Sequence, residues 1–186
     1  MKDLKDIVVE EAKRQIRKLG VKKFTVEDIA LQLSISKKTI YKHFAGKSEI
    51  VSAVVDHVIE NEKAYAERVM ASREGPLVRM EALMLFYSGE GVPGWVIEEL
   101  KIFYPEEYQK SQKLNILKRQ YFEQLFTEGV SNGEIRSDVK PLVLNLMIKK
   151  IIDAFLETDF LTKQDITINQ AIQQVRDIIL YGIAHR

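Results

Sequence analysis

The sequence predicts an all-α protein of about nine helices. Apolar residues recur at three- and four-residue spacing along most of the 186 positions, which is the pattern of helices with one buried face. Gly and Pro interrupt that pattern at several points, and no stretch alternates apolar and polar residues as a half-buried strand would. With 46% hydrophobic and 30% charged residues, the composition is that of a globular protein.

The first helix is predicted from Leu4 to Leu19, where apolar residues fall at helical spacing. Gly20 follows, and Gly is a typical residue just past a helix end. Val21 and Phe24 are expected to close a small core against this helix, which would brace the next two.

Residues 25–44, TVEDIALQLSISKKTIYKHF, predict two short helices joined by a tight turn, which is a helix-turn-helix. Thr25 and Asp28 stand three residues apart, as in a capping box that satisfies the free backbone donors of a helix start. Ser36 can cap the second helix, which we expect over Lys37–Phe44.

The second helix is expected to bury Ile40 and Phe44 and to turn basic and hydroxyl-bearing side chains outward, with no carboxylate among them. Such side chains reach phosphates and base edges, and the major groove accepts a rigidly held basic helix. Lys38 is the residue that we expect first to contact a guanine base. The residues predicted to bind DNA are Thr25, Ser36, Lys37, Lys38, Thr39, Tyr41, Lys42, His43 and Lys47. The alternative is that these are two amphipathic helices with a serine turn of the kind that is common in any helical protein.

These residues resemble the DNA-binding domain of the TetR family of bacterial transcriptional regulators (TetR/AcrR type). In that family a run ending in Tyr-x-x-Phe follows the turn, and a Lys opens the next helix; here these are Tyr41, Phe44 and Lys47. Ser34 stands where the family usually has Gly, which tolerates a positive φ more readily. The resemblance implies a homodimer that represses transcription, with a C-terminal domain that binds a small molecule altering DNA affinity.

Charge is unevenly distributed, although the net charge is only +1. Residues 1–47 hold 12 Lys and Arg against 6 Asp and Glu, a balance of +6, and the remaining residues have a balance of −5. A basic segment on a mildly acidic body is typical of a protein that binds a polyanion. Because cysteine, signal-like segments and bilayer-spanning apolar runs are absent from the sequence, we expect a cytoplasmic protein with no membrane partner.

The remaining helices are separated by Gly- and Pro-containing breaks, of which SGEGVPG at 88–94 is expected to be a mobile loop. They are predicted over about 47–71, 77–87, 95–104, 105–132, 142–156 and 168–183.

The last two helices are too apolar for a single buried face. In residues 142–156, 11 of 15 positions are apolar, whereas one stripe needs three or four in seven. A second copy of the chain is the simplest way to cover them on two sides. The predicted dimer interface comprises Leu144, Ile148, Ile151, Phe155, Ile172, Val175 and Ile179.

The middle of the chain is rich in Met and aromatic residues. At each single position a helical core is the favoured interpretation, but several together can line an apolar effector site. The candidates for ligand binding are Met80, Met84, Tyr87, Trp95, Phe103, Tyr121, Phe122 and Met147.

No pattern typical of an enzyme is present. His43, His57 and His185 lack metal-ligand spacing, and phosphate-loop, nucleophile-elbow and dinucleotide motifs are missing. We therefore expect no enzymatic activity, no cofactor and no metal.

Two domains are predicted: a helix-turn-helix DNA-binding domain at 1–46 and a helical ligand-binding and dimerisation domain at 47–186. The predicted function is that of a ligand-responsive repressor that binds a palindromic operator as a homodimer. Its partners are double-stranded operator DNA, a second copy of itself and a small apolar effector. The alternative is a helix-turn-helix protein with an architectural or protein-contact role and no small-molecule effector.

Overall fold

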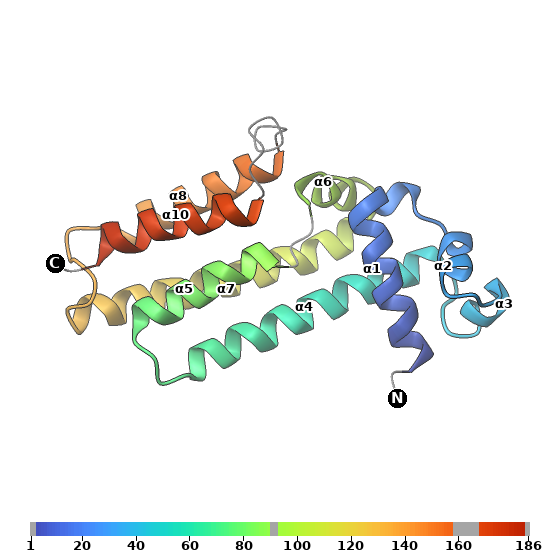
Figure 1. Ribbon diagram of the computed structural model, residues 1–186, viewed down its shortest axis with the longest axis horizontal. Helices are drawn as coiled ribbons and strands as arrows, with labels where there is room; N and C mark the ends of the chain where they lie inside the picture. The colour runs from blue at the N-terminus through green and yellow to red at the C-terminus, as the bar shows by residue number, and fades with distance from the viewer. Residues whose placement is uncertain (1–2, 90–92, 158–167, 185–186) are drawn as a thin grey trace. The chain divides into compact units, whose positions relative to one another are not determined.

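The structure is a computed structural model of the chain, and it describes residues 3–89, 93–157 and 168–184. Over these ranges the chain forms nine α-helices and no strand, which confirms the predicted all-α class (Figure 1). The helices are α1 (Leu4–Lys23), α2 (Val26–Gln32), α3 (Lys37–Ile40), α4 (Lys47–Ala71), α5 (Pro76–Gly89), α6 (Gly94–Phe103), α7 (Pro105–Ser131), α8 (Pro141–Glu157) and α10 (Ile168–Ile183). None of the described helices is long and apolar enough to cross a membrane.

The chain divides into two compact units. Unit 1 comprises Met1–Asn61 and Val92–Lys113, and unit 2 comprises Glu62–Gly91 and Leu114–Arg186. Helices α4 and α7 therefore supply residues to both units. The predicted boundary after residue 46 separates functions rather than packing clusters, and it stays a prediction.

Unit 1 is built on one apolar cluster from α1 to α4 and α6. Its most buried members include Phe24, Ile29, Ile40 and Phe44. The burial of Ile40 and Phe44 was predicted from their helical spacing. Val96 and Leu100 of α6 join the same cluster. This packing of α6 against α1 was not predicted, because nothing local in the sequence pairs them.

Gly20 interrupts α1 with a φ of 86°, so the helix predicted to end there continues for three more residues in a new direction. A Cβ at this position would strike the Glu99 carboxylate and approach Trp95 Cζ3 to 2.7 Å. Glu99 Oε2 accepts a hydrogen bond from the Lys22 backbone N–H at 3.2 Å. Gly20 is thus required by both its φ and the close approach of α6.

The second helix of the helix-turn-helix is shorter than predicted. Regular α-helix ends at Ile40, and residues 41–43 form turns. The reason lies in the hydrogen bonds: the Lys42 and His43 N–H groups bond to carbonyls three residues back, at 3.4 and 2.9 Å, instead of four. Residues 41–43 thus continue the chain after α3 as a tight turn, and their side chains are exposed.

Ser34 occupies the turn between α2 and α3 with a φ of 53°. The left-handed region costs a non-glycine residue about 1–2 kcal/mol, while Gly in place of another residue costs about 0.5–1 kcal/mol of chain entropy. We therefore expect Ser34→Gly to raise the free energy of unfolding by about 0.5–1 kcal/mol in urea titrations. The control Ser48→Gly, in the first turn of α4, has no positive φ to relieve and should not raise it. Equal effects of both substitutions would contradict strain at Ser34.

Unit 2 has its own apolar cluster, drawn from α4, α5, α7, α8 and α10. Met80, Leu125 and Ile135 are its most deeply buried members. Helix α5 extends to Gly89, so Ser88 and Gly89 belong to that helix rather than to the predicted loop. Residues 90–92 of the loop lie outside the described residues.

Candidate nucleic-acid interface

The start of α2 is fixed by the predicted capping box. Thr25 Oγ1 accepts a hydrogen bond from the Asp28 N–H, and Asp28 Oδ2 accepts one from the Thr25 N–H, both at 3.1 Å. Thr25 itself is exposed. The reciprocal bonds hold this exposed residue in one position relative to the helix that follows.

The start of α3 is fixed in the same way. Ser36 Oγ accepts a hydrogen bond from the Thr39 N–H at 3.1 Å and lies 2.9 Å from Thr39 Oγ1. The hydroxyls of Ser36 and Thr39, two of the residues predicted to bind DNA, therefore lie together at the cap of α3. Two further contacts hold α3 against α2. The Ile40 side chain is fully buried, and the backbone N–H of Ile35, in the turn, donates a hydrogen bond to Ala30 O at 3.0 Å.

The outward face of this motif is as basic as the sequence predicted. Side chains of Lys37, Lys38, Tyr41, Lys42 and His43 are exposed. Thr39 is half-buried beside its cap, so it has less freedom to reach a base edge than the lysines.

Lys37 has a partner that sequence reasoning missed. Its ammonium forms an ion pair with Glu27 of α2, and both side chains are exposed. The hydrogen bond between them lowers the pKa of Glu27 and raises that of Lys37. Glu27 precedes Lys37 by ten residues, and side chains this far apart do not meet on one helix. They come into contact because the turn brings α2 and α3 together.

The Lys47 side chain makes two contacts within unit 1. Its Nζ donates to Lys22 O at 2.8 Å and lies 4.5 Å from the centre of the Phe24 ring. Burial of the ammonium lowers the pKa of Lys47, and the nearby Glu99 carboxylate opposes that shift. The structure thus gives Lys47 a bracing contact, whereas the sequence suggested an open phosphate contact.

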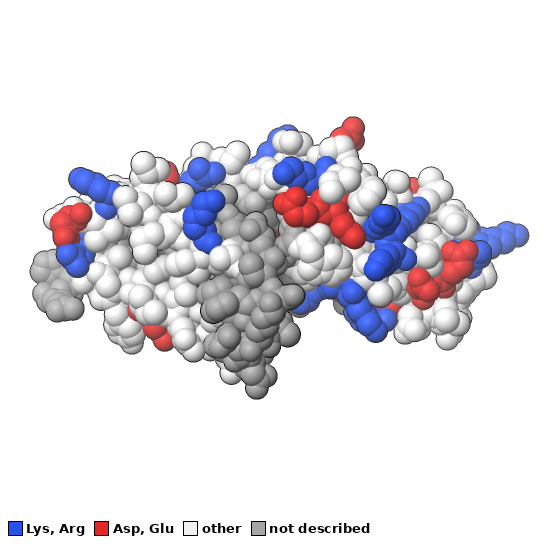
Figure 2. Space-filling view, turned by 90° about the horizontal axis from the view of Figure 1, so that it is seen from above, with Lys and Arg blue, Asp and Glu red and all other residues white. Residues whose placement is uncertain are grey.

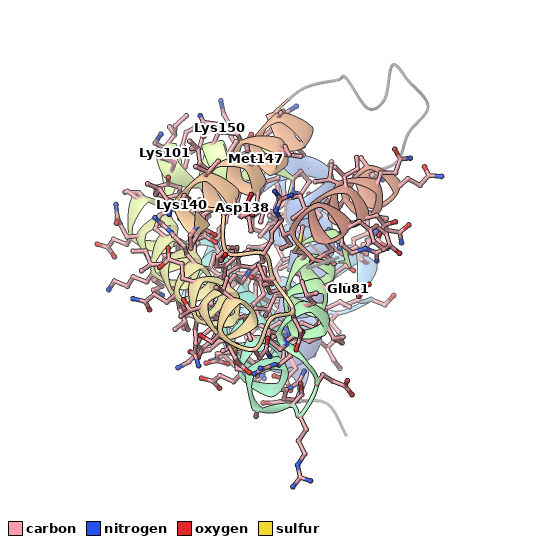
Figure 3. All side chains as sticks on the ribbon, turned by 90° about the vertical axis from the view of Figure 1, so that its left-hand side faces the viewer. Glu81, Lys101, Asp138, Lys140, Met147 and Lys150 are labelled. Atoms are coloured by element: carbon pink, nitrogen blue, oxygen red, sulfur yellow. The ribbon has the colours of Figure 1, made fainter. Side chains whose placement is uncertain are left out.

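The predicted effector residues fall into different parts of the chain. Met80, Met84 and Phe122 share the buried cluster of unit 2, and Tyr121 packs against it. Met147 is about half exposed on α8, where it lies between Lys140 and Lys150 (Figure 3). Trp95 and Phe103 belong to α6 of unit 1 and are 44% and 47% exposed, and the Tyr87 side chain lies outside the described residues.

Unit 2 also contains charged side chains that sequence analysis did not single out. Lys118 lies on the buried stripe of α7, one turn from Leu114 and from Phe122, and forms an ion pair with Glu62 of α4. Its i, i+4 spacing from the apolar residues of that stripe is the signal that could have found it. In the described part of the chain, no group of three or more His, Asp or Glu side chains could hold a metal ion.

Most predicted interface residues of α8 and α10 are used inside the protomer. Leu144, Ile172 and Ile179 are buried in unit 2. Ile148 and Val175 pack against its core, Ile151 is half-buried, and the Phe155 side chain lies outside the described residues. Buried side chains cannot supply contact area to a partner, so Leu144, Ile172 and Ile179 serve the core of their own protomer. The rest of the predicted interface stays a prediction.

A different set of apolar residues on these two helices is open to solvent. We call this set the outer α8–α10 face, and it comprises Leu142, Val143, Leu146, Met147, Ile178 and Tyr181, each at least 48% exposed. Few charged side chains appear over these helices in the view from above (Figure 2).

Comparisons with known proteins agree with this arrangement. A family model described as bacterial regulatory proteins, tetR family, matches residues 8–54. The uncharacterised HTH-type transcriptional regulator YvaF of Bacillus subtilis (strain 168) is 21% identical over 179 residues, which are 95% of this chain and 93% of YvaF.

Solved structures share the fold over the whole chain. A transcriptional regulator from Saccharomonospora viridis, in complex with choline, has a TM-score of 0.78 at 20% identity and covers 98% of both chains. FadR from Bacillus subtilis, in complex with stearoyl-CoA, has a TM-score of 0.66 at 19% identity and covers 96% of this chain and 98% of that one.

The matched family model covers the helix-turn-helix, and YvaF, which matches over nearly the whole chain, is described as an HTH-type transcriptional regulator. The helix-turn-helix part of the chain, residues 8–54, matches the TetR family model, as its residues indicated.

Proposed function

We propose that this cytoplasmic regulator binds a palindromic operator as a homodimer and represses transcription until a small effector binds. The observation that carries the proposal is the exposed basic turn of α3, held against α2 by two capping arrangements and a buried Ile40. The N-terminal part of such a helix lies deepest in the major groove. The domain division at residue 46 follows this assignment of functions.

Within that complex, Lys38 is proposed to read a guanine. No hydrogen bond or ion pair of its ammonium occurs among the described residues, so it can reach a base edge without breaking one. Thr25, Tyr41, Lys42 and His43 are proposed to contact phosphates at the flanks. Lys47 contributes by bracing the connection that precedes α2.

The experiment that tests this function is selection of bound duplexes from random DNA. We expect recovery of an inverted repeat, because two-fold symmetry of a dimer is mirrored in its site. Recovery of no common site would favour the architectural or protein-contact alternative.

Homodimerisation is supported by the outer α8–α10 face. Six large apolar side chains lie open on two neighbouring helices. Large exposed apolar patches mark interaction sites. A pair of helices from each protomer would form a four-helix contact, in which the face meets its own copy.

For the effector, we propose a small molecule that is mostly apolar and carries one anionic group. The cluster around Met80, Met84 and Phe122 supplies the apolar surroundings. Lys118 supplies a buried cation in the same unit, and one of its partners is Glu62. A buried ion pair adds little net stability, so exchange of Glu62 for a ligand carboxylate is energetically accessible.

Three probes that share a ten-carbon chain test the effector proposal by thermal unfolding: decanoate, decanol and decyltrimethylammonium, each below its micelle concentration. We expect decanoate to raise the unfolding midpoint by about 3–8 °C and the other two by less. The double variant Lys118→Met, Glu62→Gln should lose this preference, whereas the exposed control Lys113→Met should keep it. A shift that is equal for all three probes, or none at all, would contradict the anionic anchor.

A further inference from the structure

The pair formed by Glu27 and Lys37 places a carboxylate on a surface that otherwise presents cations. Glu27 is in the first turn of α2, and Lys37 is the first residue of α3. Their side chains are 61% and 50% exposed, so the pair lies at the surface where α3 would enter DNA.

The pair has little to do for stability. Exposed ion pairs contribute about 0–1 kcal/mol, and α3 is already held by the Ser36 cap and by Ile40. The effect of the ion pair is therefore expected on DNA affinity, not on the free energy of unfolding. A cation paired with a carboxylate adds no net charge, and its ammonium is held near α2 instead of being free to follow phosphates.

Non-specific DNA affinity comes from cations that neutralise phosphates, and each one adds about 0.9 to the salt slope. Lys38 and Lys42 are exposed lysines of the motif whose ammonium groups make no ion pair or hydrogen bond in the described ranges. Lys37 differs from them in that Glu27 fixes where its ammonium lies.

We infer that Glu27 is a specificity-determining positioning residue: it holds the Lys37 ammonium at the N-terminus of α3 and withholds it from non-specific phosphate contacts. The inference rests on the proposed operator-binding function. Its effect is to weaken binding to bulk DNA while leaving operator binding almost unchanged, which raises the ratio between the two affinities.

The test is binding of Glu27→Gln to two duplexes, the selected operator and a scrambled duplex of the same composition, at several salt concentrations. We expect Glu27→Gln to tighten binding to the scrambled duplex about five- to tenfold at low salt, with a salt slope steeper by about one. Operator affinity should change by less than about twofold, so the specificity ratio falls about fivefold.

Two further variants separate positioning from a general charge effect. In a Lys37→Met background, Glu27→Gln should change neither affinity, because Glu27 acts through Lys37. Asp56→Asn removes a carboxylate from another ion pair of unit 1, with Lys110, and should leave the specificity ratio unchanged.

Equal tightening on both duplexes would overturn the inference, as would an undiminished effect in the Lys37→Met background or the same fall in ratio for Asp56→Asn. If the unmutated protein prefers no duplex at all, the proposed function itself fails. The unmutated protein therefore tells the two failures apart.

Discussion

Ile178→Asp is expected to separate the proposed homodimer into folded monomers, whereas Ile179→Asp should unfold unit 2. The two residues are neighbours on α10, yet Ile178 is 73% exposed and Ile179 is 5% exposed. At Ile178 the symmetric contact would bury an unpaired carboxylate from each protomer, which costs about 2–5 kcal/mol and raises the dimer Kd at least about thirtyfold. At Ile179 the carboxylate would be buried in the protomer core itself.

Sedimentation and circular dichroism together read out this pair of variants. The unmutated protein should sediment as a dimer, Ile178→Asp as a monomer with its helical signal retained, and Ile179→Asp should lose helical signal. A stable monomer for the unmutated protein, or a dimer that survives Ile178→Asp, would contradict the outer α8–α10 face as the interface.

Lys38→Ala and Lys42→Ala are expected to weaken DNA binding in different ways. Lys38 is proposed to read a base, so its loss should cost about 1–3 kcal/mol on the operator and relax the preference at one base position. Lys42 is proposed to contact phosphate, so its loss should weaken all duplexes alike and lower the salt slope by about one. Equal losses on operator and scrambled DNA for Lys38→Ala would show that another side chain reads the base.

Local chemistry made much of this fold predictable from sequence. The capping box of Thr25 and Asp28 and the Ser36 cap depend on residues three apart, and the structure contains both. Burial of Ile40 and Phe44 follows from helical spacing. The same spacing predicted α10 and its end at Ile183.

The sequence could not assign the two apolar sides of α10. When a helix is apolar on both sides, its periodicity does not say which side meets its own protomer, and the predicted interface accordingly included the buried Ile179. The outer side, with Ile178, becomes visible only once the neighbours of the helix are known.

Contacts between distant residues were also beyond sequence reasoning. Glu27 meets Lys37 only because the turn folds α2 and α3 together, and Glu99 meets the Lys22 N–H only because α6 packs on α1. The placement of Trp95 and Phe103 in unit 1 has the same origin, since membership of a packing cluster depends on tertiary contacts.

Competition binding is the most direct measurement of the central claim, that the outward basic turn of α3 makes this protein a reader of one DNA site. A labelled duplex carrying the selected inverted repeat is bound at physiological salt and displaced with unlabelled bulk DNA. We expect displacement to need about a thousandfold or greater excess of bulk DNA over the same unlabelled repeat. Equal displacement by both DNAs would contradict the claim.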